Sequence, residues 1–264
     1  MDVVWTTIDF WANELPNFAR GGIDAAAFMQ VDWSRGGDAI VADTSIKTIE
    51  DLRGKKIALT QFTPSHWLLE TALRQSHLSS AEQQTIRDNL VFTQDASTAR
   101  SAFVARQVDA AVTWEPDVSQ ALKREQSHVL TSTKDFPNII ADALVAQKSF
   151  IKEHPKAMEA FVRGWLDGVE EAKKNPDLTA RLFMENEPLF KDLGLEATKH
   201  SFSWSYWPNL EDNARMFGLD GSAPLFDTIF SKAGAVWQSL KVIDKPLDPS
   251  TAKDDSILRK IYQK

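Results

Sequence analysis

The chain has 264 residues, 43% of them hydrophobic, so it is long enough to bury proper cores in one large or two ordinary domains. Its 37 acidic and 30 basic residues give a formal net charge of -7 without a basic block, which argues against a nucleic-acid partner. The longest apolar stretches fall far below the roughly 20 residues of a membrane helix, so no membrane insertion is expected. The absence of cysteine excludes disulfides, thiolate catalysis and cysteine-ligated metal.

The first part of the chain alternates short apolar runs with helix-like stretches, a pattern typical of parallel β-α-β units. Most runs carry apolar neighbours rather than a strict alternation, so we expect helices on both faces of the sheets. The predicted strands are Val3 to Ile8, Ala25 to Val31, Ala39 to Ala42, Lys56 to Thr60, Val91 to Thr93, Ala110 to Trp114, Val129 to Thr131 and Ile139 to Ala146.

After residue 150 the pattern becomes helical. Pro155 opens a segment with apolar residues at three-to-four spacing, and Asn175-Pro176 ends it, which predicts a helix. Further helices are expected over 178–186, 210–216 and 224–241.

Two turn-forming runs, 33–37 and 134–138, bracket a central block of the chain. We therefore expect an α/β fold of two lobes joined by a hinge. Residues 1–33 and 147–264 would form a discontinuous lobe I, and residues 34–146 would form lobe II. Ligands of such lobes bind beyond the carboxyl ends of the strands, which predicts a cleft between the lobes.

The most informative segment runs from Lys55 to His66, a strand that ends in polar residues and enters a helix. Thr63 fits the N-cap position and Pro64 the first helical position. The backbone N–H groups of Ser65 and His66 would then favour an anion or a carbonyl oxygen. Alternatively, Thr63 only caps the helix and His66 is a surface residue.

A second predicted strand ends at Trp114 and Glu115. Trp114 fits an apolar wall for a ligand, and Glu115 fits a partner for an amine, another hydrogen-bond donor or a metal. The alternative is a core tryptophan followed by a glutamate that favours a helix start.

The first strand leads through Thr7 to Asp9, where a helix begins, so Asp9 is expected to cap that helix. Trp204 and Trp207 lie with Tyr206 in a short aromatic cluster before Pro208. This cluster either lines a binding surface or fills a gap between helices.

No catalytic constellation is recognisable. The sequence lacks a Gly-x-Ser-x-Gly elbow, a phosphate loop, a His-Glu-x-x-His motif and a dinucleotide fingerprint. Its five histidines show no metal-ligand spacing. We therefore expect no enzymatic activity, no metal and no cofactor.

Several stretches, in this order, resemble the solute-binding proteins of ABC importers for nitrate, taurine and aliphatic sulfonates. They are residues 38–42, 49–58, 65–69, 102–116 and 150–155. The resemblance implies a type II periplasmic-binding-protein fold, a small-molecule solute, an ABC permease as partner and a periplasmic or other extracytoplasmic location. The start, Met1 to Trp5, carries no secretory signal, so the signal of an exported protein would be missing from this chain.

The resemblance also implies which residues hold the solute: Thr7, Asp9, Ser34, Asp38, Gln61, Thr63, Ser65, His66, Trp114 and Glu115. Trp204 and Trp207 are added from the aromatic cluster. Members of this family begin with a further β-α-β unit, which this chain is expected to lack. Its absence would leave a strand edge of lobe I exposed.

For the ligand, the helix entry at Thr63 favours an anionic head, whereas Asp9 and Glu115 favour a cationic end. A zwitterion such as an amino-sulfonate satisfies both. An enzyme that forms a thiamine pyrimidine resembles the same fold, but its cysteine-rich iron-binding run is absent here. A sensory or scaffold module with a degenerate cleft is the third alternative.

Overall fold

The chain divides into two units in the computed structural model, which describes residues 2–191 and 193–263. Unit 1 comprises residues 1–33 and 141–264, and unit 2 comprises residues 34–140. The second crossing between units thus falls at residue 140 rather than at the expected residue 146. The reason is strand β8 (Ala141–Gln147), which pairs with two strands of unit 1 along its whole length.

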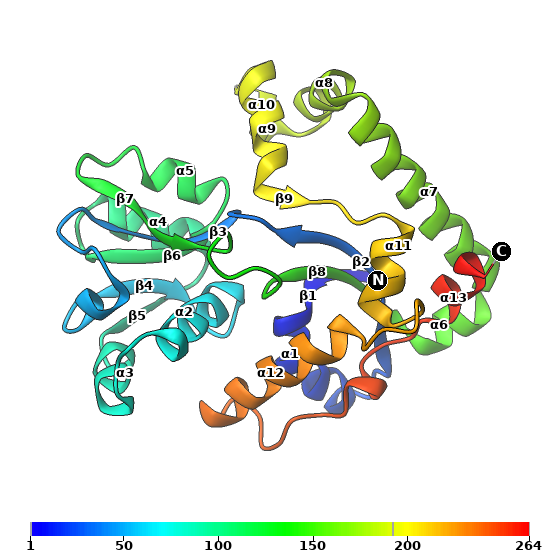
Figure 1. The fold of residues 1–264 in the computed structure, drawn as a ribbon, viewed down its shortest axis with the longest axis horizontal. Helices are drawn as coiled ribbons and strands as arrows, with labels where there is room; N and C mark the ends of the chain where they lie inside the picture. Colours follow the sequence, from blue (N-terminus) through cyan, green and yellow to red (C-terminus); the bar gives the residue numbers. More distant parts are fainter. Residues whose placement is uncertain (1, 192, 264) are drawn as a thin grey trace. The chain divides into compact units, whose positions relative to one another are not determined.

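The sheet of unit 1 has four strands in the order β1-β8-β2-β9, as Figure 1 shows. Their bounds are β1 Val3–Thr7, β2 Ala25–Ser34, β8 Ala141–Gln147 and β9 Ser205–Tyr206. Because β8 is antiparallel to both β1 and β2, these two strands are parallel to each other with β8 between them. The expected parallel direction of β1 and β2 is thus found, but β8, a strand from far along the chain, lies between them.

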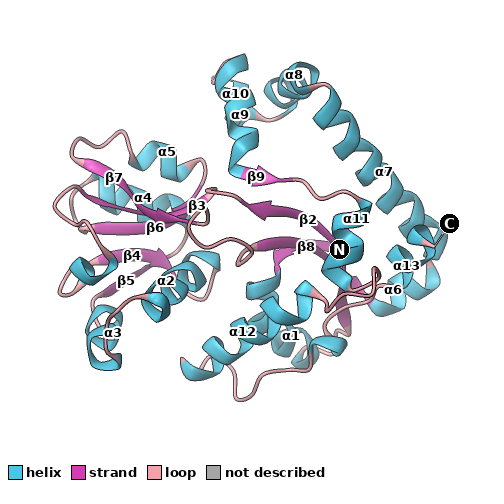
Figure 2. Ribbon diagram, in the orientation of Figure 1, coloured by secondary structure: helices cyan, strands magenta, loops and turns pink. Residues whose placement is uncertain are grey.

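Unit 1 is otherwise helical (Figure 2). Its helices are α1 Ile8–Arg20, α6 Lys148–Glu153, α7 Pro155–Lys174, α8 Pro176–Asn186, α9 Pro188–Lys191, α10 Leu195–Ser201, η2 Phe202–Trp204, α11 Leu210–Phe217, α12 Leu225–Ser239, η3 Pro249–Thr251 and α13 Ser256–Tyr262. The four helices predicted after residue 150 are confirmed as α7, α8, α11 and α12. Trp11 of α1 and Trp237 of α12 are buried in the core, and each indole N–H donates to a backbone carbonyl.

Helix α11 ends at Gly218, which has a left-handed backbone (φ 76°). A Cβ at this position would lie 2.7 Å from Pro224 Cγ. Gly218→Ala should therefore lower the free energy of unfolding by at least about 2 kcal/mol, since the clash adds to the left-handed strain. Gly221→Ala is the matched control, because Gly221 also has a positive φ but meets no atom within 4 Å. Equal costs in urea unfolding would contradict this explanation.

The sheet of unit 2 has five strands in the order β5-β4-β6-β3-β7. Their bounds are β3 Asp38–Asp43, β4 Ile57–Thr60, β5 Leu90–Thr93, β6 Ala110–Trp114 and β7 Ser127–Ser132. Strand β4 is parallel to β5 and β6, whereas β3 is antiparallel to β6 and β7. The predicted parallel units are thus confirmed for β4, β5 and β6 only.

Helices cover both faces of this sheet, as expected from its apolar strands. The helices of unit 2 are η1 Ile49–Leu52, α2 Pro64–Gln75, α3 Ser80–Arg87, α4 Ala96–Val104 and α5 Asp117–Ala121, of which α2, α4 and α5 pack on the sheet. Val41, Ala58 and Ala111 form a core with Phe103 of α4 on one face. The alternate residues of these strands point to the other face, where α2 contacts β3, β4 and β6.

The strand directions in unit 2 bring several chain segments together along one edge of the sheet, the edge formed by strand ends rather than by an outer strand. Since β4, β5 and β6 are parallel, their carboxyl ends at Thr60, Thr93 and Trp114 share that edge. The antiparallel β3 starts there, because Asp38 lies opposite Trp114. This edge carries the segments from which the candidate site is built.

Candidate functional site

The start of helix α2 follows directly from the carboxyl end of β4. Thr63 is the N-cap residue and Pro64 opens the helix, as predicted. The Thr63 side chain makes no cap hydrogen bond, because its hydroxyl donates to the carbonyl of Thr60 at 2.8 Å. The first-turn N–H groups of an α-helix have no partner inside the helix. At this helix start they can therefore donate hydrogen bonds to an acceptor from outside the helix.

Ser65 adds a second feature to the helix start. Its side chain is fully buried, and its Oγ has no hydrogen-bond partner among residues 2–191 and 193–263. The buried Oγ1 of Thr60, at the end of β4, also lacks a partner within those ranges. A buried hydroxyl without a partner costs about 1–3 kcal/mol, so the Ser65 hydroxyl in the first turn of α2 indicates a place for a polar ligand.

His66 is buried rather than on the surface, with 3% of its side chain and backbone exposed. Its Nδ1 accepts a hydrogen bond from the Phe62 backbone N–H at 3.2 Å. Burial lowers the pKa of His66 from 6.5 to about 4, with a smaller opposing effect of Glu70. The imidazole is therefore neutral at pH 7, and with Nδ1 as acceptor its proton resides on Nε2.

The low pKa of His66 predicts a specific pH dependence. Unfolded chains take up the histidine proton near pH 6.5, whereas the folded protein does so only near pH 4. The free energy of unfolding is therefore not reduced by this proton above pH 6.5. It falls by about 3 kcal/mol as the pH drops from 6.5 to 4. An NMR titration of the His66 ring should give a midpoint near 4. A midpoint above 6 would contradict the buried neutral ring.

Phe62 has a left-handed backbone (φ 60°), which is unusual for a bulky residue. This conformation turns the chain between β4 and α2 and aims the Phe62 N–H at His66. The two rings stack with centroids 5.7 Å apart. Phe62 therefore holds the His66 ring through both its backbone N–H and its own ring.

A buried ion pair fixes α2 one turn further along. The Glu70 side chain is fully buried, and Arg87 of α3 binds both its oxygens at 2.7 and 2.9 Å. Arg74 lies 3.6 Å from the same carboxylate but is 42% exposed. The Arg87 pair thus ties α2 to α3.

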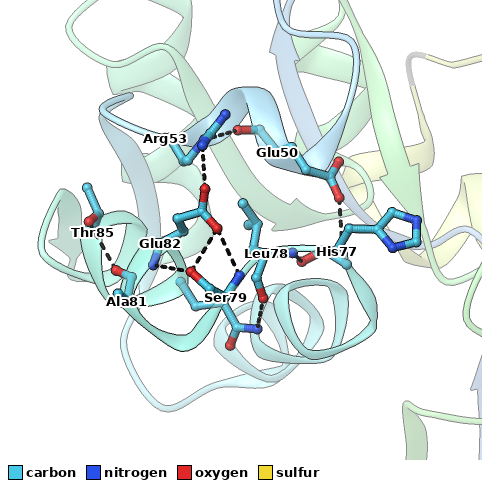
Figure 3. Close-up of polar contacts among 10 residues, drawn as sticks. Glu50, Arg53, His77, Leu78, Ser79, Ala81, Glu82 and Thr85 are labelled. Atoms are coloured by element: carbon cyan, nitrogen blue, oxygen red, sulfur yellow. Dashed lines mark hydrogen bonds and ion pairs between the residues drawn. The ribbon is translucent and has the colours of Figure 1, made fainter.

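Figure 3 shows a second polar network, at the far end of α2. Glu50 of η1 accepts a hydrogen bond from the His77 backbone N–H, and Arg53 bonds Glu82 at 2.5 Å. Glu82 also accepts from the Ser79 N–H and hydroxyl, and these bonds lower the pKa of Glu82. Both ends of α2 are therefore held by side-chain contacts.

The other predicted residues of unit 2 lie at the same sheet edge. Ser34 Oγ accepts from the Asp38 N–H at 3.1 Å and bonds Thr133 Oγ1 at 2.8 Å, so Ser34 shapes the turn into β3. The Glu115 carboxylate accepts from both the N–H and the hydroxyl of Ser119. It thereby stabilises the first turn of α5, as in the alternative interpretation. Trp114 is half-buried and Gln61 is exposed.

In unit 1 the cap of α1 is Thr7, not Asp9. Thr7 Oγ1 accepts from the Phe10 N–H at 3.3 Å, because Thr7 has the extended backbone of an N-cap residue. Asp9 lies within the first turn and is fully buried. Trp207 packs against Phe183 and Phe202, whereas Trp204 is half-buried in η2. Trp207 thus fills the space between helices.

A carboxylate pair of unit 1 was missed by the sequence reasoning. Asp142 of β8 lies opposite both Thr7 of β1 and Asp32 of β2. Burial and the neighbouring Asp32 raise the pKa of Asp142 well above its ordinary value. Neither acid stands in a motif, and only the pairing of strands far apart in the sequence brings them together.

Two classes of feature are not found in the described part of the chain. No group of three or more His, Cys, Asp or Glu side chains there has an arrangement that could hold a metal ion. No helix there combines the length and the apolar character required to cross a membrane.

Comparison with known proteins places this geometry in context. Residues 36–179 match the family model described as NMT1/THI5 like. The taurine-binding periplasmic protein of Escherichia coli is 28% identical over 53% of this chain and 42% of its own length. The putative aliphatic sulfonates-binding protein of the same organism is 34% identical over 50% and 39%. A putative binding protein of Brucella abortus is 28% identical over 62%, and this chain spans about half of its length.

Solved structures support the fold. The periplasmic aliphatic sulphonate binding protein SsuA of Escherichia coli matches with a TM-score of 0.70 and 19% identity, over 96% of this chain and 79% of that one. The desulfurization enzyme DSZB matches with a TM-score of 0.63 and 10% identity, over 99% and 85%. The predicted type II periplasmic-binding-protein fold is therefore confirmed, and both binding proteins and an enzyme share it.

Proposed function

The chain belongs to the NMT1/THI5-like family, and we propose on this basis that it is a solute-binding protein of an ABC import system. Its solute is a sulfonate or a similar small oxyanion, which binds at the start of helix α2. The observation that carries the proposal is the buried hydroxyl of Ser65, which has no hydrogen-bond partner among the described residues, at a helix N-terminus that the cap residue Thr63 leaves open.

The donors at this site are neutral. The helix start contributes a partial positive charge of roughly half an elementary charge, together with N–H groups that point along the helix axis. Ser65 can donate its hydroxyl proton, and the neutral His66 carries a proton on Nε2. A sulfonate has three oxygens that only accept hydrogen bonds, so it suits a set of donors without a fixed cation.

The anionic head is the better supported half of the expected zwitterion. The Glu115 carboxylate is engaged by Ser119, so an ammonium group would have to compete with these two bonds. Contacts of the solute with Thr7, Asp9, Asp38 and Trp114 stay predictions, as does its position between the two units. So do delivery to a permease and a periplasmic location, which the names of the relatives support.

Calorimetric titration of the full chain with methanesulfonate tests the proposal. Ser65→Ala should weaken binding about tenfold, the value of one hydrogen bond to a charged group. The folded protein should stay as stable or become more stable, because an unpaired buried hydroxyl is removed. Ser80→Ala, the same change in the exposed first turn of α3, is the control.

Two results would overturn the proposal. One is the absence of binding heat with methanesulfonate, sulfate and nitrate alike. The other is an affinity that is equal in the wild type and in Ser65→Ala. Simple amines that bind as tightly as taurine would overturn the choice of an anionic head.

A further inference from the structure

A row of three aromatic rings lies next to the start of α2. The His66 ring stacks on Phe62 with centroids 5.7 Å apart, and it lies tilted against Phe92 with centroids 5.8 Å apart. Phe92 belongs to β5, an edge strand of the unit 2 sheet, and Phe62 precedes the cap residue. The row therefore borders the same first turn that carries Ser65.

The outer ring of the row is open to solvent. Phe92 is 47% exposed, and Phe62 is half-buried. His66 adds no charge to the row at neutral pH, because its pKa is about 4. The row is thus a neutral, partly exposed aromatic surface beside a group of hydrogen-bond donors, an arrangement suited to a molecule with an anionic end and an apolar end.

Phe62 keeps its bulky side chain in a backbone conformation that glycine would adopt freely (φ 60°). The left-handed conformation is unfavourable for a residue with a Cβ. The ring offsets this cost in part by stacking on His66. The stacking and the hydrogen bond of the Phe62 N–H to His66 together hold one end of the aromatic row.

We infer that Phe62, His66 and Phe92 select a solute whose anionic head carries an aromatic or other bulky apolar group, in preference to a small or zwitterionic sulfonate. The inference rests on the proposed function, since the head must bind at the start of α2. The apolar group would lie against the row, and Phe92 determines the preference because it is the exposed ring.

Paired titrations of the full chain with benzenesulfonate and methanesulfonate test this inference. The wild type should bind benzenesulfonate at least about tenfold more tightly, because only this ligand buries an apolar ring. Phe92→Ala should weaken benzenesulfonate binding about fivefold to tenfold and methanesulfonate binding much less. Val91→Ala, a neighbouring exposed position of the same strand, is the control and should change neither affinity.

The outcomes separate this inference from the proposed function. Equal affinities of the wild type for the two sulfonates, or an equal loss of both in Phe92→Ala, would overturn the aromatic selectivity and leave the anion site in place. If neither sulfonate bound to the wild type, the proposed function would fail, and the inference with it.

Discussion

Replacing Arg87 by methionine should lower the free energy of unfolding by about 3–5 kcal/mol, the usual cost of leaving one partner of a buried ion pair alone. Glu70 has no exposed side-chain surface, and Arg87 is the partner that binds both its oxygens. After the change Arg74 would still lie 3.6 Å from the carboxylate, but without the two bonds that Arg87 makes. Urea unfolding followed by tryptophan fluorescence measures the loss.

Two further variants separate the ion pair from simple packing. Arg74→Met should cost less than about 1 kcal/mol, because that side chain is 42% exposed. The double variant Glu70→Leu with Arg87→Met should recover most of the stability, since no buried charge is then left alone. A double variant that is as unstable as Arg87→Met would show that the pair acts through shape rather than charge.

Replacing Thr63 by aspartate should weaken sulfonate binding about a thousandfold while the protein stays folded. Aspartate is a favoured N-cap residue, so its carboxylate would occupy the N–H groups of the first turn that Thr63 leaves open. A like charge about 4 Å from the bound anion costs about 4 kcal/mol at an intermediate effective dielectric constant. Calorimetry with methanesulfonate measures the loss, and thermal melting shows whether the fold is kept.

Thr63→Asn is the matched control for this charge. Asparagine has nearly the same shape and caps helices equally well, but it is neutral. It should therefore weaken binding much less than aspartate does, by competing for the N–H groups alone. Equal losses in the two variants, or unchanged binding in Thr63→Asp, would place the anion elsewhere.

Local signals in the sequence predicted the elements that carry the site. A short apolar strand followed by Thr63 and Pro64 predicts a helix start from the preferences of cap residues and proline alone. The structure has this helix start. Helix α7 was equally predictable, because Pro155 opens it and Asn175 follows its end. These features depend on residues within one or two turns of each other.

Features that depend on distant pairing could not be predicted in this way. The sequence does not indicate that β8 inserts between β1 and β2, so neither the boundary at residue 140 nor the pairing of Asp142 with Asp32 was foreseen. The burial of His66 depends in part on Phe92 of β5, which lies 26 residues further along the chain. The capping role went to Thr7 rather than Asp9, a shift of two residues that the composition of the segment left open.

The backbone amide NMR signals of Ser65 and His66 during a titration with methanesulfonate test the anion site most directly. If the oxyanion binds at the start of α2, these two signals should shift most, in proportion to the occupancy measured by calorimetry, and should not shift in Thr63→Asp. Saturable binding that leaves both signals in place and moves signals elsewhere would contradict the assignment of the site.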